Sequence, residues 1–114
     1  MDFWCRQVID FAFDWETLRQ AEEQAAWIAR EPSNPRPYYH LAQFYRTQGK
    51  SREALALLLE AVRRDDSCAD AHVALAEIYA VGGDYPAAWR HARAAEHHGN
   101  RRAVHLLHRH GVAE

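Results

Sequence analysis

Imidazoles gathered at the C-terminal end are the first residues of this chain that could do chemistry. His105 and His108 stand one helical turn apart, and imidazoles that lie close together can hold zinc or nickel. A strong metal site would add cysteines or carboxylates at set spacing, and Cys68 is distant in the sequence. We therefore expect a solvated polar face and no metal or cofactor, and keep metal binding through His105 and His108 as an alternative. The histidines after residue 90 are His91, His97, His98, His105, His108 and His110.

Residues that could carry catalysis are few. The acidic pair at 65–66 stands in a predicted turn, and the pair at 22–23 stands on the wet side of a predicted helix. The chain has no glycine-rich phosphate loop. Its three serines occupy predicted loop or cap positions: Ser33, Ser51 and Ser67. The sequence therefore predicts a protein that is not an enzyme.

Composition and charge exclude further classes of protein, among them those that bind nucleic acid. At 114 residues the chain is expected to form one domain with a modest core. The net charge is −2, with no run of Lys or Arg longer than two residues, so it has no basic footprint for nucleic acid.

Two features of the chain bear on its location. Cys5 and Cys68 are far apart, which favours unpaired intracellular thiols. The apolar start of the chain carries Asp2, Arg6 and Asp10, unlike a signal peptide or a membrane span. We expect a cytoplasmic protein without membrane contact.

The elements that position these residues follow a repeat of 34 residues. Sliding residues 35–68 onto 69–102 aligns small and large residues at matching places. A fixed period of this length is typical of stacked repeats, and glycine and proline occur only between the predicted helices. We therefore predict an all-α chain without strands. The aligned pairs are Leu41 and Leu75, Ala42 and Ala76, Tyr45 and Tyr79, Gly49 and Gly83, Ala54 and Ala88, and Ala61 and Ala95.

Local signals divide the chain into helices. Asp14 is a predicted N-cap, Ser51 and Asp84 are predicted caps of the second helix of each copy, and Pro86 falls in a first turn. Helices are predicted over residues 1–13, 15–30 and 101–110. Each of the two copies adds a pair of helices, and the first helix of the first copy covers residues 37–48.

The repeated pattern resembles the tetratricopeptide repeat. With Pro35 as place 1, the first copy carries an aromatic at Tyr38, a leucine at 41, a small residue at 42 and a glycine at its turn. The second copy departs at His72, where a bulky aromatic is usual. The resemblance implies a right-handed α-solenoid of stacked helix-turn-helix repeats, in one domain over residues 1–114. Its units would be a degenerate helix pair at 1–34, repeats at 35–68 and 69–102, and a capping helix at 103–112.

The resemblance also implies a binding groove. In this family the first helix of each repeat lines a concave groove, chiefly through places 2, 5, 9, 12 and 13. Tyr39, Gln43 and Ala74 stand where carboxylate-clamping repeats carry Lys and Asn, which argues against a carboxylate clamp. The predicted groove residues are Cys5, Ile9, Arg36, Tyr39, Gln43, Arg46, Asp70, Val73 and Glu77. The apolar row through Cys5, Tyr39 and Val73 would be continued near Leu107, and Arg36 beside Asp70 could instead be an exposed pair between helices.

The resemblance implies a protein-interaction module, a scaffold or assembly adaptor that binds a peptide or partner protein in its groove. A dedicated small secretion or assembly chaperone that holds one subunit is the alternative. The aromatics near the N-terminus exceed what one small helix pair can bury by itself. They could seal the stack, form a homodimer or partner interface, or fill space left by the alanine-rich helices. These aromatics are Phe3, Phe13, Trp15 and Trp27.

Overall fold

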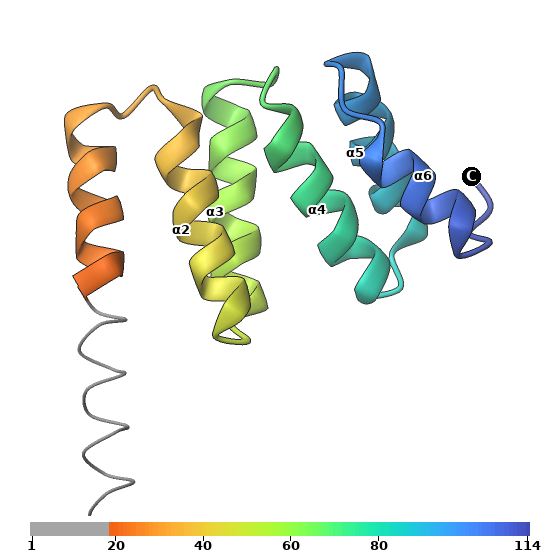
Figure 1. Ribbon diagram of the computed structural model, residues 1–114, viewed down its shortest axis with the longest axis horizontal. Helices are drawn as coiled ribbons and strands as arrows, with labels where there is room; N and C mark the ends of the chain where they lie inside the picture. The colour runs from red at the N-terminus through yellow and green to blue at the C-terminus, as the bar shows by residue number, and fades with distance from the viewer. Residues whose placement is uncertain (1–18) are drawn as a thin grey trace, which may run out of the picture.

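The computed structural model describes residues 19–114, which form helices joined by short turns (Figure 1). The described residues contain no strand, so the all-α prediction is confirmed. The predicted helix over residues 1–13 and the predicted N-cap Asp14 lie outside the described residues. The helices are residues 19–30, α2 (Pro35–Thr47), α3 (Ser51–Arg64), α4 (Ala69–Val81), α5 (Tyr85–His97) and α6 (Arg102–Arg109).

The helices stack in pairs along the long axis of the molecule. α2 packs against α3, α4 packs against α5, and the contact between α3 and α4 joins the two pairs. α6 packs against α4 and α5 (Figure 1). This is the predicted α-solenoid closed by a capping helix. No helix of residues 19–114 combines the length and apolar character needed to cross a membrane.

Two hydrophobic clusters hold the stack together, and α4 contributes to both. Leu75 and Ala74 belong to the cluster between α2, α3 and α4, together with the fully buried Leu58. Val73 and Ala76 belong to the cluster that α4 forms with α5 and α6. α4 is therefore covered on two sides, and residues 71–76 are all buried.

Small residues let α5 approach its neighbours closely. Ala88, Ala92 and Ala95 are completely buried in the cluster with α4 and α6. Ala92 stands at a place where the family often has Phe, and the adjacent Trp89 is itself 4% exposed in the same cluster. The alanines set the close approach, and Trp89 supplies the bulk.

The turns follow the predicted chemistry at Asp84, Gly49 and Gly83, and Asn34 adds a cap that was not predicted. Asn34 and Asp84 cap α2 and α5, since their side-chain oxygens accept from the backbone N–H groups of Arg36 (3.0 Å) and Ala87 (3.2 Å). Gly49 and Gly83 end the first helix of each pair with φ values of 75° and 83°, a region that favours glycine.

Ser51 was predicted as a cap, and this is wrong. It is the first residue of α3, and Lys50 stands at the N-cap without a side-chain hydrogen bond. The backbone N–H of Lys50 donates to the Tyr45 carbonyl at 2.9 Å, which ties the turn to the preceding helix. Lys50 therefore takes the N-cap position, and Ser51 is already inside the helix.

Two predicted boundaries also shift. α2 begins at Pro35 rather than residue 37, because Asn34 provides a cap before the proline. The capping helix spans Arg102–Arg109 rather than 103–112. Gly111 has a φ of 69° and turns the chain, and the N–H of Val112 returns to the Leu107 carbonyl at 3.0 Å.

The close approach of α5 makes a testable prediction. Ala88→Leu adds volume to a completely buried site, so we expect it to lower the free energy of unfolding by about 1–3 kcal/mol. Ala56→Leu, on the exposed surface of α3, is the matched control and should change it by less than about 0.5 kcal/mol. Urea unfolding followed by circular dichroism measures both, and equal stabilities would contradict the tight packing described above.

Candidate functional site

α2, α4 and α6 together form one surface, which we call the groove face. Its centre is a small hollow of about 40 Å³ lined from all three directions, by Tyr39 and Gln43 of α2, Asp70 and Glu77 of α4, and Arg102 at the start of α6. The first helix of each repeat therefore contributes to one continuous surface, and the second helices α3 and α5 do not line this hollow.

A chain of hydrogen bonds crosses the groove face from α2 to α4. The Gln43 amide donates to the Tyr39 hydroxyl at 3.0 Å, and Arg46 Nη1 donates to Gln43 Oε1 at 3.0 Å. Arg46 Nη2 then donates to Glu77 Oε2 at 3.1 Å, forming an ion pair between the two helices. Glu77 Oε1 also lies 3.8 Å from a guanidinium nitrogen of Arg102. Four of the predicted groove residues are thus brought together and held by one another.

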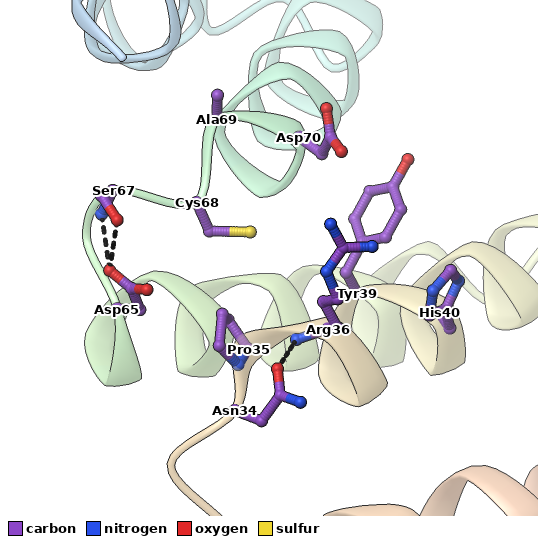
Figure 2. A pocket seen from close by; sticks show the side chains of 10 residues that line it. All are labelled: Asn34, Pro35, Arg36, Tyr39, His40, Asp65, Ser67, Cys68, Ala69 and Asp70. Carbon is purple, nitrogen blue, oxygen red and sulfur yellow. Dashed lines mark hydrogen bonds between the residues drawn. The ribbon is translucent and has the colours of Figure 1, made fainter.

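Arg36 and Asp70 both line another, larger hollow, and they do not form an ion pair with each other (Figure 2). This hollow has a volume of about 380 Å³ and lies between the starts of α2 and α4. Figure 2 shows Arg36 and Tyr39 rising from α2 toward Asp70. Asp70 accepts instead from the Asn100 amide at 3.3 Å. The exposed pair between Arg36 and Asp70, which was one of two alternatives, does not form. The Arg36 guanidinium faces the hollow instead.

Cys68 lines the same hollow as a free thiol. Burial raises its pKa above the ordinary value, because the thiolate would lose solvation. Its reactivity at neutral pH is therefore low. Cys5, the other cysteine, lies outside the described residues.

The predicted apolar row offers little surface in the described residues. Val73 is only 5% exposed, because α5 and α6 cover it, and Leu107 is buried in the same cluster. Cys5 and Ile9 lie outside the described residues. Tyr39 is therefore the member of this row that is half-buried at the groove face.

Sequence reasoning missed a second, apolar hollow on the groove face. It has a volume of about 390 Å³, and its apolar lining comes chiefly from Val81, Tyr85, Leu106 and Val112. Val81 is 89% exposed and Tyr85 is 46% exposed. Val81 occupies place 13 of the second copy, which is one of the groove places of the family. The repeat register could therefore have predicted Val81 as a groove residue.

His72 fills the place where the family usually has a bulky aromatic. Its side chain is 3% exposed, and Nε2 lies 2.8 Å from the Asp66 carbonyl, so this nitrogen carries the proton and donates. Its Nδ1 lies 3.1 Å from Nδ1 of His91, so one of these two nitrogens donates a hydrogen bond to the other. The His91 ring stacks on Tyr79 at 5.6 Å between centroids. An imidazole pair thus links α4, α5 and the turn before α4.

This pair changes the titration of His91. Burial, followed by the nearby His72 and Arg90, lowers the pKa of His91 to about 4, and Asp66 opposes this shift. His91 is therefore neutral in the folded protein at neutral pH.

The histidines predicted as alternative metal ligands do not gather into a site. His105 and His108 are both exposed, and the His108 ring packs against Trp89 at 5.0 Å between centroids. Within residues 19–114, no three or more histidine, cysteine or acidic side chains lie close enough together to hold a metal ion.

Trp27 is the one N-terminal aromatic of the predicted dimer surface that the structure describes. It stacks on His40 at 6.0 Å between centroids, and its indole N–H donates to Glu31. Phe3, Phe13 and Trp15 lie outside the described residues, so the homodimer stays a prediction.

Comparison with known proteins adds one match. A family model described as Tetratricopeptide repeat matches residues 14–95, which is more than half of the chain. No curated protein matches the chain.

The buried histidine pair predicts a pH dependence of stability. The unfolded chain protonates His91 near pH 6.5, but the folded protein does so only near pH 4. The stabilisation from neutral His91 is therefore complete above pH 6.5 and is lost as the pH falls toward 4. We expect a loss on the order of 1 kcal/mol in urea unfolding between these pH values.

His91→Phe removes the titrating group and should flatten this dependence. His105→Gln, at an exposed position, is the matched control and should keep it. An NMR titration of the His91 ring protons reads the same pKa directly, and a midpoint near 6.5 would contradict the buried pair.

Proposed function

The chain belongs to the tetratricopeptide repeat family, and from that premise we propose that it is a non-enzymatic module that binds a partner protein or peptide on its groove face. The family is in general a protein-interaction repeat. The proposal assigns the recognition to α2, α4 and α6, which present side chains from successive repeats to one surface.

The observation that carries the proposal is the cross-helix network from Tyr39 to Glu77. Two helices hold the hydroxyl, amide, guanidinium and carboxylate in a row, each 3.0 to 3.1 Å from the next. Such preorganised groups lose little side-chain entropy when a partner binds. They also lie beside two hollows of about 380 and 390 Å³, each large enough for a side chain.

The residues of this network and the nearby Arg36 have separate roles in the proposal. Arg36 offers a guanidinium that forms no ion pair with residues 19–114, which suits a backbone carbonyl or a carboxylate of the partner. Tyr39 offers a half-buried ring and hydroxyl, a residue type common at binding hot spots. Arg46 and Glu77 fix the distance between α2 and α4 and thereby the width of the surface.

The double variant Tyr39→Ala with Arg46→Ala tests the proposal. It removes the central ring and the cross-helix ion pair, so we expect loss of the partner band in a pull-down from a lysate of the source organism. The matched control is Arg52→Ala with Arg90→Ala, two exposed residues on the second helices α3 and α5. Circular dichroism melting checks that both variants fold. An unchanged set of bands for the groove variant would contradict the proposal.

A further inference from the structure

We propose that the half of the groove face between α4 and α6 binds an acidic segment of a partner protein, anchored by an apolar side chain in the hollow beside Val81. This inference rests on the proposed function and narrows the chemistry of its partner. It follows from three observations: an exposed apolar hollow, the excess of arginine around it, and the different character of the rest of the groove face.

The anchor site is the apolar hollow. Val81 is 89% exposed and Tyr85 is 46% exposed, which are two of the three exposed large hydrophobic side chains among residues 19–114. Both line the hollow of about 390 Å³, opposite the half-buried Leu106 and Val112. When a partner covers apolar side chains clustered around a hollow, their removal from water favours binding. A volume of this size holds one aromatic or branched aliphatic side chain with part of its backbone.

The rim of this hollow carries an excess of positive charge. A neighbouring hollow of about 480 Å³ shares Leu106 and is lined by Arg102 and Arg109. Arg109 forms no ion pair with any residue of the described part of the chain, and Arg102 reaches only the 3.8 Å contact with Glu77. Glu77 is the one carboxylate that lines either hollow, and it is already bonded to Arg46. Carboxylates beside the apolar anchor would therefore meet the Arg109 guanidinium and the Arg102 guanidinium, whose contact with Glu77 is long.

The other half of the groove face differs in character. Around Tyr39 and Gln43 the polar groups satisfy one another, and the exposed surface of the central hollow of about 40 Å³ is polar. Val73 beneath it is buried. The place for an apolar anchor is therefore at α4 and α6, where Val81 and Leu106 are accessible.

A protein segment fits this surface better than other anionic partners. The whole chain has a net charge of −2, so it is not attracted as a body to a membrane or to nucleic acid. The positive charge is local, on two turns of α6, and it adjoins a hollow rather than a flat apolar surface. An apolar side chain flanked by Asp or Glu matches both features at once.

The test is a selection of random peptides of about twelve residues displayed on phage against the immobilised full chain. We expect the selected peptides to combine aromatic or aliphatic residues with Asp and Glu. The best of them is then synthesised with a fluorescent label, and its affinity is measured by anisotropy. Selected peptides without acidic enrichment would overturn the inference.

Two variants assign the contact to the proposed surface. Val81→Glu places a carboxylate in the exposed hollow and should weaken the selected peptide by at least about tenfold. Arg109→Gln should weaken it by about threefold and reduce its salt dependence. Both positions are exposed, so folding is expected to be kept, which a melting curve verifies. Leu59→Glu is the matched control, since Leu59 is 40% exposed on α3 and lines neither hollow.

The outcomes separate this inference from the proposed function. If the peptide survives Val81→Glu but is lost in the double variant Tyr39→Ala with Arg46→Ala, the groove binds and the proposed anchor is wrong. If Leu59→Glu weakens the peptide as much as Val81→Glu, the α4–α6 surface is not the site. If no peptide depends on either groove variant, the proposed function itself is overturned.

Discussion

The burial of α4 from two sides is the constraint on which the rest of the structure depends. A surface helix buries one apolar stripe, but α4 buries Leu75 toward α2 and α3 and Ala76 toward α5 and α6. A single helix thus joins both hydrophobic clusters, as the centre of a stacked array requires. The cost is that α4 has few residues left to offer a partner, chiefly Asp70, Glu77 and Val81.

Because α4 has few exposed residues, the groove face has a polar half near α2 and an apolar half near α6. Near α2, the polar residues of α4 are occupied by α2 itself, since Arg46 binds Glu77 across the interface. Near α6, Val81 is the last residue of α4, and it is exposed beside Leu106. The polar half is held by hydrogen bonds between its own side chains, and the apolar half leaves hydrophobic surface exposed.

The histidine pair gives the second repeat a polar group in its core. His72 replaces a bulky aromatic, and such a group is tolerated only when its hydrogen bonds are satisfied. The Asp66 carbonyl and the His91 ring satisfy both of its nitrogens. The turn before α4 is thereby fastened to α5, a link that an apolar residue at this place could not make.

The sequence by itself determined the parts that depend on local signals. The period of 34 residues predicted the helix pairs, Gly49 and Gly83 marked their turns, and Asp84 marked a cap, because each acts within a few residues of its own position. The repeat register also selected Tyr39, Gln43, Arg46 and Glu77, which the structure brings together. Only the tertiary structure decided that Val73 is covered, that His72 meets His91, and that Val81 and Leu106 share a hollow. Spacing shows which residues share a side of one helix, but how deeply a neighbouring helix covers that side depends on packing between distant segments.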